Sequence, residues 1–185
     1  MKKIFIFTLI IAVTLLIPDL YGQKKNWGIG LRLGDPSGIS VKKYMGKNAW
    51  EFSIGRSHFF KNDRWYNDYY NDIYDDYDYY DRDNDPIGIQ VHYLWTKPIR
   101  DLRGLDWYYG LGGQIVTDSY TVYYKDGDKE KITNFDLGAD GVLGLEYNFA
   151  DAPIALFGDL TLEMEVYDDF FELWFQPCIG ARFNF

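Results

Sequence analysis

Hydrophobic and polar residues alternate with a period of two along most of the chain after residue 26. In the segment 154–166, for example, Leu160, Leu162 and Met164 occupy one phase, and Thr161 and Glu163 occupy the other. Because successive side chains of a β-strand point to opposite faces, this period predicts strands, and no segment of helical period competes with them. Eight segments show the pattern: 27–34, 38–45, 49–57, 87–95, 105–116, 135–149, 154–166 and 171–185.

The polar phase of these segments is rich in glycine, and this bears on which face meets water. A soluble lipid-carrying barrel exposes its polar face to water, whereas a membrane barrel turns that face toward its lumen. Glycine weakens strands and adds no solubility, but inside a narrow barrel it leaves room for large charged side chains. The glycines are Gly28, Gly30, Gly34, Gly55, Gly88, Gly110, Gly112, Gly138, Gly144 and Gly180. They favour a membrane barrel, with the soluble lipocalin-like carrier as an alternative.

Aromatic residues of the apolar phase lie near the ends of the predicted strands. Membrane barrels carry such rings at both interfaces, where an amphipathic ring meets the lipid headgroups. The residues are Trp27, Trp50, Tyr93, Trp95, Trp107, Tyr109, Tyr147 and Phe149. Their placement again favours a barrel in a membrane.

The connections between the segments differ in length in a regular way. If the N-terminus lies in the periplasm, odd-numbered connections face outward. The third and fifth, 57–86 and 119–134, are long and polar, while the second and sixth, around 46–48 and 150–153, are tight. Both long connections then fall on one side, as in outer-membrane barrels. The predicted fold is all-β, an eight-stranded antiparallel up-and-down transmembrane β-barrel over 23–185 with extracellular loops at 57–86 and 119–134.

The first residues predict a secretory signal peptide. A basic start at Lys2 and Lys3 precedes an apolar run over 4–17, and the small residue Gly22 follows. This order predicts a signal peptide over 1–22, cleaved near Gly22. A membrane anchor needs at least ~18 apolar residues, and Pro18 ends the run too early. The mature chain is therefore expected to be exported, and with Cys178 as its only cysteine it forms no internal disulfide.

The last segment ends in "CIGARFNF", which places Phe183 and Phe185 on one face. A chain with a signal peptide, eight alternating strands and this ending resembles the small OmpA/OmpX-type outer-membrane β-barrel proteins of Gram-negative bacteria. The resemblance covers nearly all of the mature chain. It implies contact with outer-membrane lipid, and it implies that Phe183 and Phe185 form the signal read by the barrel-assembly machinery. Pro177 departs from a regular last strand, since proline cannot donate to the ladder, and predicts a bulge there.

With the polar phase turned inward, acidic side chains outnumber basic ones in the lumen. A barrel of ~8 strands has an interior just wide enough for side chains to fill, and buried unpaired charge is expensive. We therefore expect a lumen plugged by hydrogen-bonded ion pairs, with a narrow cation channel as the alternative. The predicted lumen network comprises Arg32, Lys42, Glu51, His92, Asp140, Glu146, Asp159, Glu163 and Arg182.

Ser57 and His58, with Asp63 nearby, raise the question of an enzyme. Barrels of the resembling type include lipid A acyl-modifying enzymes that use His with Ser and an acidic residue at the outer rim. Neighbouring residues of a strand point to opposite faces, and nothing in the sequence forces three groups to converge. We expect no enzyme, no catalytic residues and no cofactor, with a lipid-modifying outer-membrane enzyme as an alternative.

The segment 62–85 consists almost entirely of Tyr, Asp and Asn. Asp81, Asp83 and Asp85 alternate as in a calcium loop, but Pro86 stands where an EF-hand requires Gly, so a cation site and a solvated acidic loop both stay open. The formal net charge of −9 argues against a nucleic-acid partner. Because Tyr supplies large contact area at low entropic cost, we expect a structural or adhesive role in which the loops bind an extracellular ligand of unknown identity.

Overall fold

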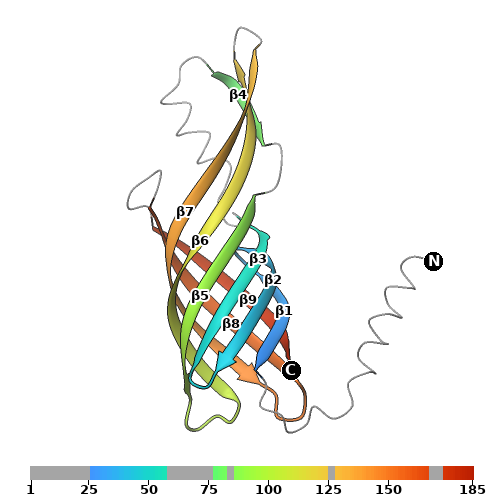
Figure 1. The fold of residues 1–185 in the computed structure, drawn as a ribbon, viewed down its shortest axis with the longest axis vertical. Helices are drawn as coiled ribbons and strands as arrows, with labels where there is room; N and C mark the ends of the chain where they lie inside the picture. Colours follow the sequence, from blue (N-terminus) through green and yellow to red (C-terminus); the bar gives the residue numbers. More distant parts are fainter. Residues whose placement is uncertain (1–25, 58–76, 83–85, 125–127, 167–172) are drawn as a thin grey trace, which may run out of the picture.

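The computed structural model describes residues 26–57, 77–82, 86–124, 128–166 and 173–185, so the predicted signal peptide lies outside the described residues. The regular structure of the described residues is β-strand (Figure 1). The strands are β1 (Trp27–Leu33), β2 (Ser37–Met45), β3 (Asn48–Arg56), β4 (Tyr77–Arg82), β5 (Ile87–Pro98), β6 (Leu105–Tyr124), β7 (Lys129–Asn148), β8 (Ile154–Glu165) and β9 (Leu173–Asn184). The described part of the chain contains no helix long and apolar enough to cross a membrane.

Eight of these strands form a closed antiparallel barrel. Neighbours pair in the order β1, β2, β3, β5, β6, β7, β8 and β9, and β9 pairs again with β1. Beside this last pairing, Trp27 N donates to Phe185 O at 3.0 Å and Phe185 N donates to Trp27 O at 2.8 Å. Closure of this kind removes the strand edges from a barrel wall. The predicted eight-stranded barrel is confirmed.

The two ends of the barrel differ (Figure 1). One end, here called the terminal end, holds Trp27 and Asn184 together with the connections 46–47, 99–104 and 149–153. At the opposite end, here called the extension end, β6 and β7 continue past the other strands, and β4 lies beside them. As predicted, the connections around 46–48 and 150–153 are tight, and both lie at the terminal end.

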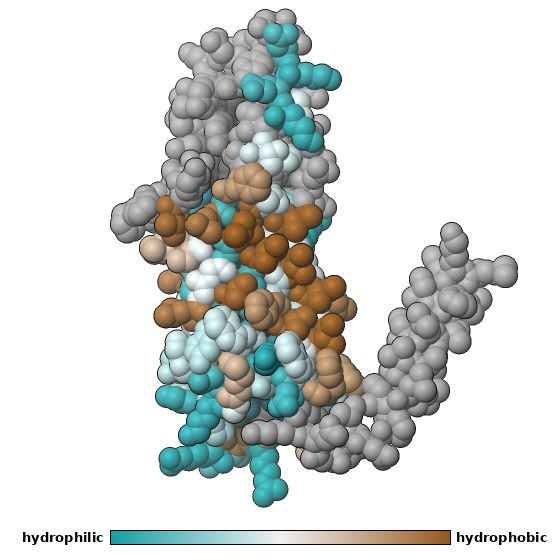
Figure 2. Space-filling model, viewed as in Figure 1, coloured by the Kyte–Doolittle hydropathy of each residue, from teal (hydrophilic) through white to brown (hydrophobic). Residues whose placement is uncertain are grey.

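The barrel wall is apolar outside and polar inside. Leu31, Leu143 and Phe175 are 68%, 58% and 64% exposed, while the inward neighbours Arg32 and Gln176 are buried. Exposed apolar side chains come from all eight barrel strands and form a belt, one face of which is shown in Figure 2. Monomeric soluble proteins rarely expose a continuous apolar surface of this extent, and transmembrane barrels require one. The wall therefore fits lipid and excludes the soluble carrier.

The segment 119–134, predicted as a loop, is mostly strand. The β5–β6 pairing ends at Ile87 and Thr117, but β6 and β7 stay paired with each other as far as Tyr123 and Lys129. Part of the other predicted loop, 57–86, is also strand, because β4 pairs with residues 120–124 of β6. We call this three-stranded unit, formed by β4, 118–124 and 129–136, the outer extension. Alternation was too weak in these segments for strands to be predicted.

The predicted bulge at Pro177 is wrong, because the β8–β9 register is continuous through the Leu160–Pro177 pair. The β1–β9 pairing ends at Leu33 and Ile179, before Pro177 is reached. A Cβ built on Gly34, just past the end of β1, would overlap the carbonyl oxygen of Pro177. That carbonyl therefore faces the β1 side, and in an antiparallel ladder the nitrogen of a residue faces the same neighbour as its carbonyl. The missing N–H of Pro177 thus falls where the ladder has already ended.

Candidate functional site: the charged lumen

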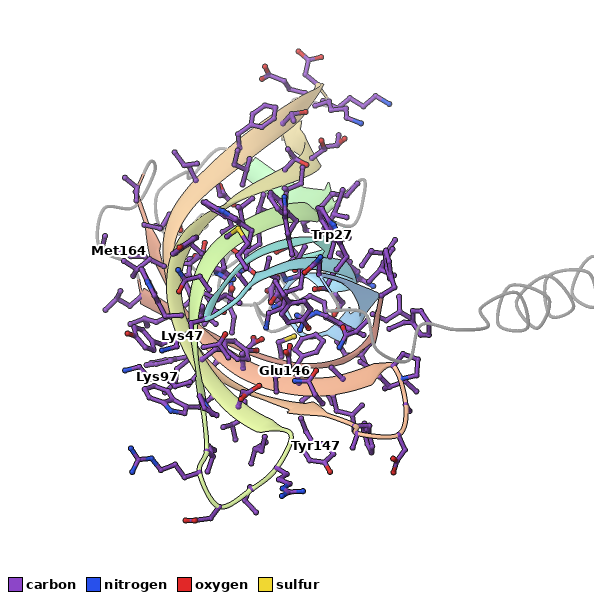
Figure 3. All side chains as sticks on the ribbon, turned by 60° about the horizontal axis from the view of Figure 1, so that its bottom comes forward. Trp27, Lys47, Lys97, Glu146, Tyr147 and Met164 are labelled. Carbon is purple, nitrogen blue, oxygen red and sulfur yellow. The ribbon has the colours of Figure 1, made fainter. Side chains whose placement is uncertain are left out.

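All nine residues of the predicted lumen network lie inside the barrel, with buried side chains. They come from β1, β2, β3, β5, β7, β8 and β9. Glu146 is labelled inside the barrel in Figure 3, where the terminal end is turned forward. Each alternates with outward apolar residues, so the period of two that fixes the wall also fixes the contents of the lumen. They form two groups that differ in charge, one toward the terminal end and one toward the extension end.

Arg182 is central to the first group. Its Nη1 lies 2.8 Å from Glu146 Oε2, its Nη2 forms an ion pair with Glu51, and its Nε donates to Ser40 Oγ at 3.1 Å. Lys42 Nζ donates to the same Glu146 oxygen at 2.8 Å. The fixed fork of the guanidinium thus spans two carboxylates contributed by different strands.

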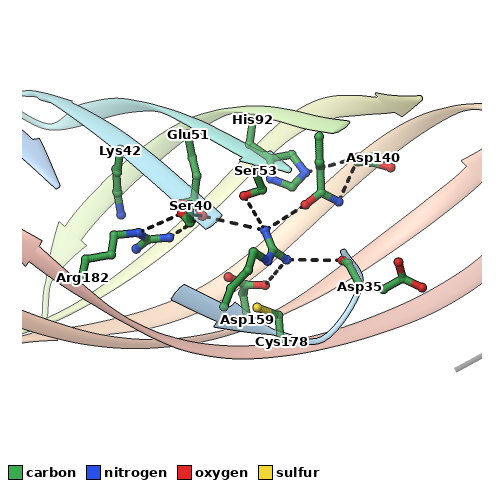
Figure 4. Close-up of polar contacts among 12 residues, drawn as sticks. Asp35, Ser40, Lys42, Glu51, Ser53, His92, Asp140, Asp159, Cys178 and Arg182 are labelled. Carbon is green, nitrogen blue, oxygen red and sulfur yellow. Dashed lines mark hydrogen bonds and ion pairs between the residues drawn. The ribbon is translucent and has the colours of Figure 1, made fainter. Parts of the chain in front are cut away.

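Arg32 occupies the next position in the lumen, in contact with Ser53 and Asp159, which are both labelled in Figure 4. Its Nη1 donates to Ser53 Oγ at 2.9 Å and to Gln90 Oε1 at 3.0 Å. Its guanidinium also lies 3.9 Å from Glu51 and 3.8 Å from Asp159. Glu51 therefore connects the two arginines. The first group, which we call the ion-pair cluster, comprises Arg32, Lys42, Arg182, Glu51, Glu146 and Asp159.

Tyr108 closes one side of the ion-pair cluster. Its hydroxyl donates to Asp159 Oδ2 at 2.7 Å, and Lys42 Nζ lies 4.5 Å from the centre of its ring. Space for the ring comes from Gly144 on the neighbouring strand, where an added Cβ would overlap it. The ring therefore fills the lumen, and it gives Asp159 a hydrogen bond in addition to its ion pair.

Phe157 supports the cluster from another side. The guanidinium carbon of Arg182 lies 3.5 Å from the centre of the Phe157 ring, a cation–π contact with a fully buried cation. Gly180 leaves room for this ring, since a Cβ at that position would overlap it. The small inward residues predicted from the sequence thus make space for two inward aromatic rings as well as for charges.

The second group lies toward the extension end. Asp140 and Glu163 are paired neighbours on β7 and β8, and both are buried. His92 Nε2 lies 3.4 Å from Asp140 Oδ2, and Gln176 Nε2 donates to Glu163 Oε2 at 2.6 Å. The four buried carboxylates of this region, which we call the outer acidic group, are Asp136, Asp140, Glu163 and Glu165.

The arrangement of the ion-pair cluster is that of a structural plug. Three cations and three carboxylates balance in formal charge, and direct contacts link them across the lumen. Buried ions of this kind are tolerated when each has an opposite charge and further hydrogen bonds. The cluster has these partners without any substrate or metal.

The described residues contain no group of three or more His, Cys, Asp or Glu side chains arranged to hold a metal ion. The possible cation-binding loop cannot be placed in full: Asp83 and Asp85 lie outside the described residues, and Asp81 belongs to β4. Of the residues considered for an enzyme, Ser57 donates a hydrogen bond to Asp35, and His58 and Asp63 lie outside the described residues.

Sequence reasoning left several contributors out of the predicted network. Tyr108, Tyr44 and Phe157 each contact a charged member of the ion-pair cluster. Tyr44 Oη, for example, donates to Glu146 Oε1 at 3.1 Å. Their inward parity was available from the alternation, but only charged residues and His92 were included in the predicted network. Parity was the better guide.

No family model matches the chain, and no curated protein matches it. Solved structures do match. A major outer membrane protein from Thermus thermophilus is similar with a TM-score of 0.50 at 10% identity, over 88% of this chain and 100% of that chain. Neisserial surface protein A gives 0.45 at 10% identity over 86% and 94%, and Ail of Yersinia pestis gives 0.46 at 10% identity over 86% and 93%.

At this level of identity the likeness concerns the fold alone. Together with the closed wall and its apolar belt, it defines the class of protein. This chain has the fold of the small eight-stranded outer-membrane β-barrels.

Proposed function

We propose that the barrel lies in the outer membrane of a Gram-negative bacterium, with its terminal end in the periplasm, and displays the outer extension as a binding surface. The observation that carries this proposal is the length of β6 and β7. Seven residues of β6, 118–124, lie beyond its last pair with β5. At about 3.3 Å per residue they reach roughly 20 Å above the rim.

A structural plug accounts for the lumen but not for this extension. Maintaining a barrel needs strands only long enough to cross the apolar belt, which takes roughly 9–11 residues. β5, β8 and β9 have 12 residues each, whereas β6 and β7 have 20 each. The added length is accounted for by a role outside the membrane.

Charge and composition indicate the kind of partner. The segment 57–86 holds nine Asp and seven Tyr against three Lys or Arg. A segment of this composition would repel sulfated polysaccharides and favour a cationic or neutral polypeptide that contacts tyrosine. The proposed role is therefore non-enzymatic binding at the cell surface.

The test replaces 118–134 with Asn-Gly, which joins Thr117 and Phe135 by a two-residue turn. These two residues are already paired, so the shortened hairpin should close in the same register. We expect the variant to keep the heat-modifiable gel migration of a folded barrel and to lose binding to a panel of immobilised basic and neutral proteins. Equal binding by the full-length protein and the shortened variant would overturn the proposal.

The same fold bears on the channel and on assembly. Because the ion-pair cluster fills the lumen, we expect no conductance steps from the full-length protein in a planar bilayer.

The rings of Phe183 and Phe185 stack with centroids 6.4 Å apart at the terminal end. This pair, in which Phe185 is exposed and Phe183 is half-buried, supports its proposed role as the assembly signal. Phe185→Ala should slow insertion by the assembly machinery without slowing refolding in detergent.

A further inference from the structure

The terminal end carries a positive rim on a chain whose formal net charge is −9. Three acidic side chains of this end are exposed or half-exposed: Asp101 and Asp151 in the connections, and Asp106 at the start of β6. Five exposed side chains of the same end are basic: Lys43, Lys47, Lys97, Arg100 and Arg103. The basic residues thus gather at the end opposite the outer extension.

Next to this rim, aromatic rings form a continuous array on the outer wall. Trp50 contacts Tyr93 with ring centroids 5.0 Å apart, and Tyr93 contacts Trp95 at 5.1 Å. Tyr109 then stacks on Trp95 at 5.5 Å and on Trp107 at 5.5 Å. The array crosses β3, β5 and β6 and lies between the apolar belt and the basic rim, where a membrane barrel meets the lipid headgroups.

Two lysines lie at the edge of this array. Lys97 Nζ lies 5.3 Å from the Trp107 ring centre and 5.5 Å from that of Tyr109. Lys47 is its neighbour, because Thr96 N donates to the Lys47 carbonyl at 2.7 Å. Figure 3 shows both lysines on the same side of the barrel. Cation–π contacts hold the Lys97 ammonium against the wall at headgroup level, with its remaining N–H donors free for an anion.

We propose that Lys47, Lys97 and the adjoining aromatic array bind the headgroup phosphate of an anionic phospholipid. The lysines supply the countercharge, the rings contact the glycerol region, and the acyl chains lie along the apolar belt. Placing this lipid in the periplasmic leaflet rests on the orientation proposed above. The site itself does not, because a vesicle presents the same lipid in both leaflets.

The experiment uses the full folded barrel in phosphatidylcholine vesicles that contain a small fraction of brominated lipid. Bromine quenches tryptophan on contact, and Trp50, Trp95 and Trp107 lie in the array. Brominated phosphatidylglycerol should quench more strongly than brominated phosphatidylcholine at the same mole fraction. A basic side chain near an anionic surface corresponds to a roughly five-fold preference, so Lys47→Gln and Lys97→Gln should each reduce the preference by about that factor.

The matched control is the pair Lys129→Gln and Lys131→Gln in the outer extension, which removes the same charge far from the rim. This control should keep the wild-type preference, and molar salt should weaken it in both proteins. Equal quenching by the two brominated lipids in the wild type would overturn the proposal. So would a full wild-type preference in a variant that lacks both Lys47 and Lys97. Neither result bears on binding by the outer extension, which is scored separately by the turn variant.

Discussion

The ion-pair cluster and the outer acidic group occupy the same lumen but solve the problem of buried charge differently. In the cluster, Glu146 contacts both Lys42 and Arg182 at 2.8 Å. In the outer acidic group, Glu163 contacts an amide and Asp140 contacts an imidazole. The cluster therefore consists of oppositely charged side chains that the strand pairing brings into contact. The contacts of the outer acidic group include an amide and an imidazole, and the group lies closer to the extension end.

This difference indicates which of the buried charges stabilise the fold. Removing one partner of a buried ion pair leaves the other charge without its countercharge, whereas neutralising one carboxylate in a group rich in carboxylates also relieves repulsion. The two groups should respond differently to equivalent substitutions. All the free energies below refer to equilibrium unfolding by denaturant in lipid vesicles.

Arg182→Met should give the largest effect. It leaves Glu51 and Glu146 without their shared guanidinium, and loss of one partner from a buried pair costs about 3–5 kcal/mol of unfolding free energy. The control Arg103→Met, at an exposed arginine of the connection 99–104, should stay within about 0.5 kcal/mol. Arg182→Lys, which keeps the charge but loses the fork, should lie between them. A loss of under about 1 kcal/mol for Arg182→Met would contradict the central role of this arginine.

Glu146→Gln should come next. The substitution keeps the side-chain shape but removes the negative charge that Lys42 and Arg182 share, and hydrogen bonds to charged groups contribute about 1.5–3 kcal/mol. A double-mutant cycle with Lys42→Met should show coupling. If the two changes add without interaction, the ion pair at 2.8 Å contributes nothing to stability.

Gly144→Ala tests the packing of the cluster without changing any charge. The added methyl group overlaps the Tyr108 ring and displaces its hydroxyl from Asp159, and overpacking of this kind typically costs about 1–3 kcal/mol. Gly141→Ala is the matched control, because nothing lies within 4 Å of its Cβ position. Equal stability of the two variants would show that the ring is free to move.

Glu163→Gln in the outer acidic group should give the smallest effect, a change in unfolding free energy of under about 1 kcal/mol. The group is rich in carboxylates, so removing one relieves repulsion with Asp140 while an amide can still contact Gln176. The difference in unfolding free energy between Glu163→Gln and Glu146→Gln compares the outer acidic group with the ion-pair cluster most directly. If Glu163→Gln destabilised the barrel as much as Glu146→Gln, the distinction between the two groups would fail.

The sequence was sufficient for the wall and for the parity of the lumen. Gly144 and Glu146 alternate with Leu143 and Leu145, and this fixes both the strand and the face each residue presents. It could not supply the ion pairs. Arg182 reaches Glu146 only through the pairing of β9 with β8 and of β8 with β7, and that register is a property of the closed barrel.

The outer extension was missed for a different reason. The segments 77–82 and 118–134 carry tyrosines and charges at both parities, so neither face is marked as buried. Their strands are defined by backbone pairing above the rim, where both faces can be polar. Alternation reports a difference between two environments, and it fails where a strand has the same environment on both sides.

The central claim is that the wall turns its apolar phase to lipid and its polar phase inward. Spin labels at single cysteines placed at 116, 142, 143 and 145, in a Cys178→Ser background and in lipid vesicles, test it directly. Collisions with dissolved oxygen, which concentrates in the bilayer core, should be frequent at 143 and 145 and rare at the inward positions 116 and 142. The opposite phase, or equal accessibility at all four positions, would contradict the barrel as described.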